Sequence, residues 1–270
     1  FKNSKEFETK LSEPSSTRLL LLNTTDKILK DKNLRKAIQH IVDKKTIGKF
    51  ILSDTESPAD FVLAENVPYA KVGLKPYEYN MVEAEKILDE AGWIKSPNKK
   101  IREKNGEKLK IQISYNTNNP TDRSISEFLQ GEFLKVGIEL DLLGEEDQTY
   151  KDRLRAGKFQ MAGYVSWGNP YEPHSFLGAM TSPIIYGDYA AQQGVPDKKE
   201  IDKSILKALE STSEEERQNN YKFVLERLHD EAVYIPISYE RNRVVYSKKI
   251  KKVSFDVSKY NIPVYDFDVE

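Results

Sequence analysis

The sequence contains no cysteine, only three histidines among 270 residues, and no long apolar run. The lack of cysteine excludes disulfides, thiolate nucleophiles and zinc–cysteine sites. No apolar stretch approaches the roughly 20 residues that a membrane-spanning helix needs. Neither sign of charge is in excess, because 42 Lys and Arg face 43 Asp and Glu. This balance argues against nucleic-acid binding, which favours a clustered positive excess.

Motifs that mark common enzyme sites are also missing. The sequence has no nucleophile elbow, no phosphate-binding glycine loop and no dinucleotide fingerprint. The acidic run 145–147 follows a predicted strand and precedes a predicted helix, where acidic side chains stabilise the helix start. An enzyme built on Glu145, Glu146 and His174 would need these groups around one reacting atom, and no nucleophile–base pair supports it. We therefore expect a protein that is not an enzyme.

The three histidines limit metal chemistry. His40 and His229 fall on predicted helices, where we expect packing or surface roles, and only His174 lies in a candidate site. No two of them have the i,i+4 spacing of a helical metal site. The chain alone therefore lacks the nitrogen and sulfur ligands that a borderline metal such as nickel prefers. A bound transition metal would need a small chelator to supply most of its ligands.

Strand and helix patterns alternate along the chain and predict an α/β fold. Asn105-Gly106 predicts a hairpin turn, and residues 109–115 and 138–142 alternate as strands on either side of a helix at 122–136. Such a strand–helix–strand unit predicts parallel strands. Other predicted strands lie at 18–23, 159–165, 233–239, 243–247 and 252–256. Other predicted helices lie at 34–44 (capped by Asn33), 81–91 (capped by Asn80), 147–157, 197–210 and 214–230, and residues 52–79 are expected to form a long loop.

The loop that follows Val165 is the strongest candidate site. Ligands of open parallel sheets bind beyond the carboxyl ends of the strands, which points to the loops after residues 115, 143 and 165. The last of these loops brings together Trp167, Asn169, Tyr171 and His174. Aromatic walls with a few polar groups suit a cleft for a small ligand. The alternative is an aromatic loop that only packs on the core.

Several segments carry a resemblance to a known family. They are Asp31-Lys32-Asn33-Leu34-Arg35-Lys36-Ala37-Ile38 with Asp43-Lys44, residues 79–93, and Phe133-Leu134-Lys135-Val136-Gly137-Ile138. Through them the chain resembles the family 5 extracellular solute-binding proteins, the dipeptide-, oligopeptide- and nickel-binding components of ABC importers. Residues 167–177 and 228–239 are similar to the nickel-binding members of this family.

The resemblance implies a lobe of a type II periplasmic binding protein, with a mixed, mainly parallel sheet flanked by helices. Family members are about twice as long and close two lobes on the ligand by a hinge motion. Matched by position, this chain is the carboxy-terminal half. Residues 1–15 would be a hinge or lead-in segment, residues 16–239 the carboxy-terminal ligand-binding lobe, and residues 240–270 a return segment of the absent amino-terminal lobe.

The resemblance also implies the ligand: nickel carried as a small-molecule chelate such as nickel–histidine. Binding of dipeptides or oligopeptides is the alternative within the same family. Similar nickel-binding proteins can coordinate the metal through a histidine after Met180, but the matching residue here is Ile185. We therefore expect no metal ligand from this chain. The residues expected at the ligand are Trp167, Tyr171, Asn169, His174, Tyr150 and Tyr186.

Partners and location follow from the same resemblance. We expect contacts with the permease subunits of an ABC importer, and nickel as transported ligand rather than as a resident cofactor. We expect a monomer, peripheral to the membrane, which is periplasmic or lipid-anchored outside the cell.

Overall fold

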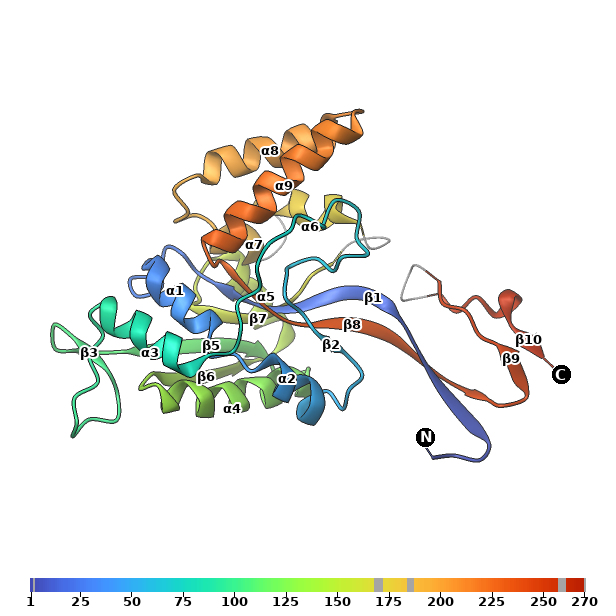
Figure 1. Cartoon of the computed structure of the whole chain (residues 1–270), viewed down its shortest axis with the longest axis horizontal. Coiled ribbons are helices and arrows are strands. Elements are labelled where there is room, and N and C mark those ends of the chain that lie inside the picture. Colours follow the sequence, from blue (N-terminus) through green and yellow to red (C-terminus); the bar gives the residue numbers. More distant parts are fainter. Residues whose placement is uncertain (2, 168–171, 184–186, 257–260, 270) are drawn as a thin grey trace.

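The computed structural model describes residues 1, 3–167, 172–183, 187–256 and 261–269. Its centre is a six-stranded sheet with the order β2-β8-β1-β7-β5-β6 (Figure 1). The strands are β1 (Phe7–Leu22), β2 (Ser57–Pro58), β5 (Lys110–Asn116), β6 (Glu139–Glu145), β7 (Met161–Val165) and β8 (Tyr234–Ser247).

The sheet is mixed, as the sequence predicted. Strand β5 pairs in parallel with β6 and β7, and helix α4 (Pro120–Lys135) connects β5 to β6 as expected. Strands β2, β8, β1 and β7 pair in antiparallel fashion. Antiparallel pairs thus outnumber parallel ones, which corrects the expectation of a mainly parallel sheet. The reason is that β1 and β8, from opposite ends of the chain, pair with each other in the middle of the sheet.

Helices cover both faces of this sheet (Figure 1). Leu20 and Leu22 of β1 join one core with helices at residues 32–39, 81–90 and 120–135, while Leu19 and Leu21 join a second core with the helices between residues 147 and 230. The run of four buried leucines therefore follows from a strand with helices packed on both sides. The remaining helices are α1 (Lys32–Gln39), α2 (Lys44–Thr46), α3 (Met81–Glu90), α5 (Asp147–Arg155), α6 (Pro173–Ala179), α7 (Gly187–Ala191), α8 (Lys198–Glu210) and α9 (Glu214–Asp230).

Local signals for turns and caps are confirmed in several places. The side chain of Asn80 accepts from the backbone N–H of Glu83 and begins α3. Asn105 and Gly106 have φ of 53° and 81° and join β3 (Glu103–Lys104) to β4 (Glu107–Lys108), as a type I′ hairpin requires.

The predicted helix 34–44 differs in the structure. Helix α1 starts earlier, because Asp31 rather than Asn33 provides the cap, and it ends at Gln39. Asp43 then caps a new helix, with its side chain accepting from the N–H of Thr46, and a π-helical turn follows at Ile47–Ile51. A second capping residue inside the predicted span therefore divides it.

Strands β1 and β8 continue beyond the sheet as a two-stranded arm, seen on the right of Figure 1 with both chain ends. Residues 7–16 belong to β1, although the sequence predicted only a hinge or lead-in segment at residues 1–15 and a strand from residue 18. Pairing with β8, rather than burial, holds them in a strand. Strand β8 also joins the two strands predicted at 233–239 and 243–247. The arm ends in β9 (Ile250–Lys252), a 3-10 turn (Val264–Asp266) and β10 (Asp268–Val269).

Candidate ligand-binding site

The carboxyl ends of β5, β6 and β7 lie at one edge of the sheet, because these strands are parallel. Strand β1 runs the other way, so Arg18 of β1 pairs with Val165 at the end of β7. The residues of β1 before Arg18 lie beyond this edge, so the arm leaves the lobe where the predicted ligand loop begins. The expected site and the expected hinge thus share one edge.

Ser166 anchors the start of the ligand loop. Its N–H donates to the carbonyl of Thr17 at 2.8 Å, and its hydroxyl oxygen accepts from the N–H of Thr17 at 2.8 Å. Trp167 follows directly and is half-buried, packed against the core that contains α5 to α9. Its indole Nε1 donates to Tyr164 Oη at 3.2 Å. The predicted ligand residue Trp167 therefore lies at this edge of the sheet, where the hydrogen bonds of Ser166 and Tyr164 hold it.

His174 lies in the first turn of α6. Glu172 caps this helix, since its carboxylate accepts from the N–H groups of His174 at 2.5 Å and Ser175 at 2.9 Å. The Nδ1 of His174 is hydrogen-bonded to the hydroxyl of Tyr221, and its ring lies 6.3 Å from that of Tyr69. One ring nitrogen of His174 is thus engaged by α9, and its contact with a ligand stays a prediction.

Tyr150 of α5 is buried beneath β7, with 6% of its surface exposed. Its hydroxyl donates to the carbonyl of Gly163. Burial raises the pKa of this phenol well above its ordinary value, with the charges of Asp122 and Glu145 adding to the shift. The described contacts of Tyr150 are internal, and its role at a ligand stays a prediction.

Three of the predicted site residues, and the position where relatives can carry a metal-binding histidine, lie outside the described residues. They are Asn169, Tyr171, Tyr186 and Ile185.

A buried group of charges at the same edge was missed by sequence reasoning. Arg18 reaches Asp122 at 2.9 Å, Glu56 at 3.2 Å and Glu240 at 2.6 Å. We call these four residues the Arg18 cluster. Burial raises the pKa of Asp122 to about 6; the attraction of Arg18 opposes this shift, and the charge of Glu240 adds to it. The sequence does show an arginine, Arg18, directly before a run of leucines in a predicted strand. Its acidic partners could not be identified from the sequence, because they are distant along the chain.

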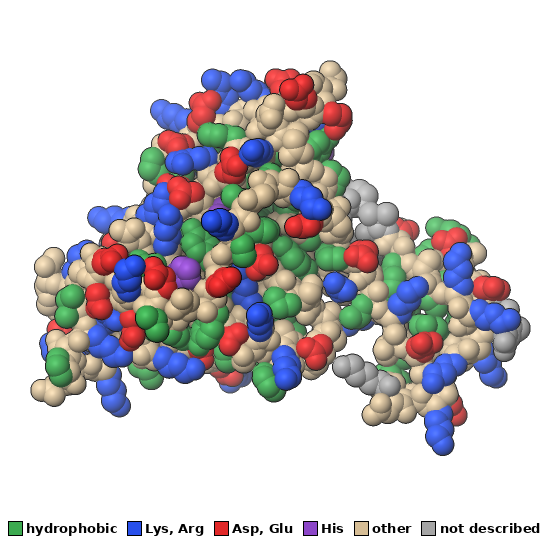
Figure 2. Space-filling view, in the orientation of Figure 1, with side chains coloured by type: hydrophobic (Ala, Val, Ile, Leu, Met, Phe, Trp, Pro, Cys, Tyr) green, Lys and Arg blue, Asp and Glu red, His purple; other side chains and the backbone are tan. Residues whose placement is uncertain are grey.

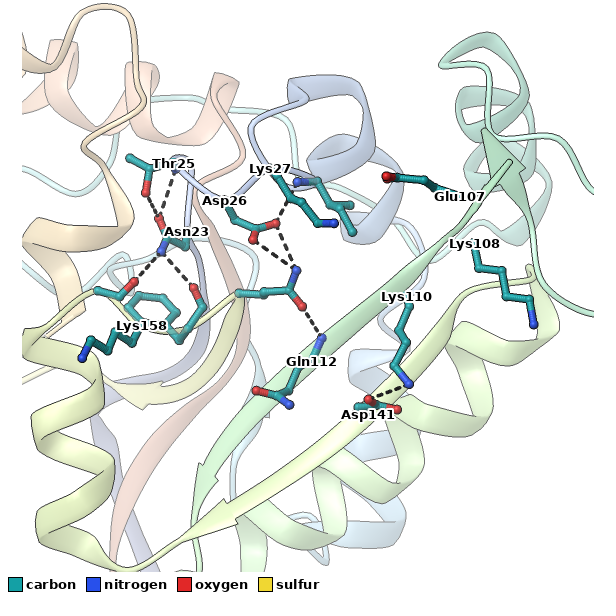
Figure 3. A pocket seen from close by; sticks show the side chains of 14 residues that line it. Asn23, Thr25, Asp26, Lys27, Glu107, Lys108, Lys110, Gln112, Asp141 and Lys158 are labelled. Atoms are coloured by element: carbon teal, nitrogen blue, oxygen red, sulfur yellow. Dashed lines mark hydrogen bonds and ion pairs between the residues drawn. The ribbon is translucent and has the colours of Figure 1, made fainter. Parts of the chain in front are cut away.

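A pocket of about 830 Å³ lies at the opposite edge of the sheet, near the amino ends of β5 and β7 (Figure 3). Charged side chains of both signs line it. Lys110 pairs with Asp141 at 2.9 Å, and Gln160 donates to Asp26 at 3.1 Å. This pocket is remote from Trp167, and Phe159 is its only aromatic lining residue among those that the structure describes, so we do not place the ligand there.

The described residues contain neither a metal-binding cluster nor a membrane-spanning helix. Within the described ranges, no group of three or more His, Asp or Glu side chains is arranged to hold a metal ion. No helix in this part of the chain is long and apolar enough to cross a membrane. On the face shown in Figure 2, basic and acidic side chains are interspersed.

Comparisons with known proteins give consistent results. The model of the bacterial extracellular solute-binding proteins, family 5 middle, matches residues 1–187. The nickel-binding periplasmic protein of Escherichia coli (strain K12) is 38% identical over 263 residues, which cover 97% of this chain and 50% of that protein. NikA from Brucella suis, solved in complex with Fe(III)-EDTA, gives a TM-score of 0.95 at 40% identity, covering 100% of this chain and 54% of NikA.

NikZ from Campylobacter jejuni, solved in complex with Ni(L-His), gives a TM-score of 0.75 at 27% identity and covers 94% of this chain and 50% of NikZ. The chain therefore spans about half the length of these relatives. The fold expected from the sequence, a lobe of a type II periplasmic binding protein, is confirmed. The chain belongs to the bacterial extracellular solute-binding proteins, family 5.

Proposed function

We propose that this chain is the carboxy-terminal lobe of the substrate-binding component of an ABC importer, which captures nickel as a complex with a small chelator such as histidine. The observation that carries the proposal is the half-buried indole of Trp167 at the carboxyl edge of the sheet, held by Tyr164. Similarity to the nickel-binding protein of Escherichia coli supports nickel as the metal. The complexes named for NikA and NikZ, Fe(III)-EDTA and Ni(L-His), support a chelated metal.

The surroundings of the three histidines also favour a chelate. His40 Nδ1 contacts the carbonyl of Glu78 at 2.8 Å, and His229 Nε2 contacts the carbonyl of Lys75 at 2.9 Å. These two rings hold the same loop, and His174 contacts Tyr221. With no cysteine in the sequence, a chelator is the better source of nickel ligands. The proposed role of the lobe is binding rather than catalysis.

The domain boundaries are part of the proposal. Residues 16–239 form the lobe, and residues 1–15 and 240–270 connect it to a second lobe. Among the described residues, seven of the fourteen exposed large hydrophobic side chains fall in these two terminal segments, which hold 46 of the 270 residues: Phe1, Phe7, Leu11, Val245, Ile262, Val264 and Tyr265. Apolar surface gathered in this way is typical of a region that packs on another part of a protein.

The remaining parts of the proposal concern the whole transporter. The two-lobed protein delivers its ligand to the permease subunits, acts as a monomer, and works in the periplasm or as a lipid-anchored protein outside the cell. Membership in an extracellular solute-binding family supports the transport role and the location outside the cytoplasm.

Calorimetry tests the proposal on the two-lobed protein, titrated with nickel chloride alone, nickel with two equivalents of L-histidine, L-histidine alone, and a metal-free tripeptide. We expect tight binding of the nickel–histidine mixture only. Trp167→Ala should weaken it about 10- to 100-fold, because a desolvated aromatic anchor contributes about 1.5–3 kcal/mol. Trp93→Phe, far from the loop, is the control and should bind normally.

Two results would contradict the proposal. Tight binding of bare nickel by Trp167→Ala would show that neither chelator nor indole is needed. Tight binding of the tripeptide without metal would instead support the peptide-binding alternative.

A further inference from the structure

Trp167, Tyr164 and Asp188 form a continuous chain of hydrogen bonds behind the proposed ligand wall. Trp167 Nε1 lies 3.2 Å from Tyr164 Oη, and Tyr164 Oη lies 2.6 Å from Asp188 Oδ2. Tyr164 belongs to β7 and Asp188 to α7, so the chain connects the ligand loop to two elements of the lobe. The second distance is typical of a hydroxyl that donates to an ionised carboxylate.

The chemistry of the three groups fixes the direction of this chain. An indole N–H can only donate, so the oxygen of Tyr164 must accept from Trp167. The hydroxyl hydrogen of Tyr164 then needs an acceptor of its own, and the carboxyl of Asp188, when it is ionised, can only accept. Burial raises the pKa of Asp188 to about 7, and the hydrogen bond with Tyr164 opposes this shift. With Asp188 ionised, the order is Trp167 to Tyr164 to Asp188, and the carboxylate orients the hydroxyl that orients the indole.

Asp188 is placed in the interior with few other contacts. Only 1% of its surface is exposed, and its second oxygen, Oδ1, has no hydrogen-bond partner among the described residues. Helix α7 packs tightly on β1, because a Cβ added at Gly187 would lie 2.6 Å from Leu21 Cδ1. A buried carboxyl with an unsatisfied oxygen costs free energy, so its presence needs a compensating role. Among the described residues, this carboxyl is hydrogen-bonded to its own backbone N–H and to the hydroxyl of Tyr164, and only the second bond involves another residue.

We propose that Tyr164 and Asp188 are positioning residues that hold the indole of Trp167 in its binding orientation before the ligand arrives. The inference rests on the proposed function, since it concerns the same ligand wall. Fixing a side chain in advance increases affinity because less rotamer freedom is lost on binding. Tyr164→Phe should therefore weaken binding of the nickel–histidine complex about tenfold, the effect of one hydrogen bond of about 1.4 kcal/mol.

A spectroscopic measurement separates positioning from simple stabilisation. The chain has two tryptophans, so Trp93→Phe leaves Trp167 as its single indole. In this background, the hydrogen-bond-sensitive indole band in ultraviolet resonance Raman spectra should shift in Tyr164→Phe toward the position of a free N–H. Asp188→Asn keeps an acceptor for Tyr164 and should retain the wild-type band, whereas Asp188→Ala should shift it.

Tyr234→Phe is the matched control. Tyr234 is buried and its hydroxyl contacts the backbone carbonyl of Asp188 at 3.5 Å and the side chain of Gln192, and neither of these hydrogen bonds involves Trp167. This variant loses a hydroxyl in the same region and should leave both the indole band and the affinity unchanged. A shifted band in Tyr234→Phe equal to that in Tyr164→Phe would overturn the inference.

The binding titration distinguishes failure of the inference from failure of the proposed function. If the wild-type two-lobed protein binds nickel–histidine and Tyr164→Phe binds it equally well, or if the band does not move, positioning by Tyr164 is overturned alone. If the wild-type protein does not bind nickel–histidine at all, the proposed function is overturned and the inference falls with it.

Discussion

At the scale of single residues, Arg18 shows how a buried cation can be outnumbered by its partners. It contacts the carboxylates of Glu56, Asp122 and Glu240, while Ser16 and Ser238 donate to Glu240 and Glu56 at 2.6 Å. Burial disfavours the charged form of Asp122, and its pKa rises to about 6 despite the nearby guanidinium.

Asp122→Asn tests this pKa shift through stability. The folded-state pKa of Asp122 lies above its ordinary value of 3.8, so the folded protein binds this proton more tightly than the unfolded chain does. The contribution of Asp122 to the free energy of unfolding is therefore fully present below about pH 4 and is lost as the pH rises to about 6. From pH 4 to pH 7 the free energy of unfolding should therefore fall by roughly 2 kcal/mol more in the wild type than in the variant. Urea unfolding at both pH values measures this, and an equal fall in the two proteins would refute the shift.

The residues of the site differ in how far the sequence could predict them. Trp167 lies two residues after the end of β7, so the rule for strand ends could place it at this edge of the sheet without any tertiary information, and its contact with a ligand stays a prediction. The Arg18 cluster could not be assembled in this way, because Arg18 is separated from its three partners by 38, 104 and 222 residues. The support of Trp167 by Asp188 was missed for the same reason, since the strand end and α7 are not adjacent in the sequence.

At the scale of elements, the sequence predicted those that are set by local signals. The cap at Asn80, the Asn105-Gly106 turn and the β5–α4–β6 unit all depend on residues within a short span. The outer half of β1 depends on β8, more than 220 residues away, and its exposed polar side chains give no strand pattern. The division of the predicted helix 34–44 depended on Asp43, whose capping role competes with helix continuation.

Two glycines allow a matched test of element packing. Gly131 is exposed inside α4, and a Cβ there would meet nothing within 4 Å. Gly131→Ala should therefore stabilise the protein by about 0.5–1 kcal/mol, the helix-propensity difference. A Cβ at Gly194 would lie 2.2 Å from the carbonyl oxygen of Thr24, so Gly194→Ala should destabilise it by about 2 kcal/mol or more. Thermal unfolding of both variants checks these opposite signs, and a stabilised Gly194→Ala would show that Gly194 and Thr24 are not in this contact.

At the scale of the whole molecule, the arm is the part that exposes large hydrophobic side chains to water. Ile262 and Tyr265 are 70% and 81% exposed, and neither belongs to the cores of the lobe. The proposed second lobe would cover them.

Replacing both residues, Ile262→Ser with Tyr265→Ser, should reduce self-association and binding of a hydrophobic dye by the 270-residue chain. The free energy of unfolding of the lobe should change by less than about 0.5 kcal/mol, because neither residue packs in it. Val82→Ser, a single exposed apolar residue on α3 with 77% exposure, is the control and should have little effect on either property. An equal decrease in both variants would argue against a specific docking surface on the arm.

In the proposed function, Trp167 forms one wall of a site for chelated nickel. A crystal structure of the two-lobed protein grown with nickel and L-histidine, with anomalous diffraction recorded at the nickel edge, tests this most directly. We expect one nickel peak in the cleft, coordinated by nitrogen and oxygen atoms of histidine molecules, with the indole of Trp167 packed against the complex. A nickel ion coordinated directly by His174 or other side chains of this chain, or a peak remote from Trp167, would contradict it.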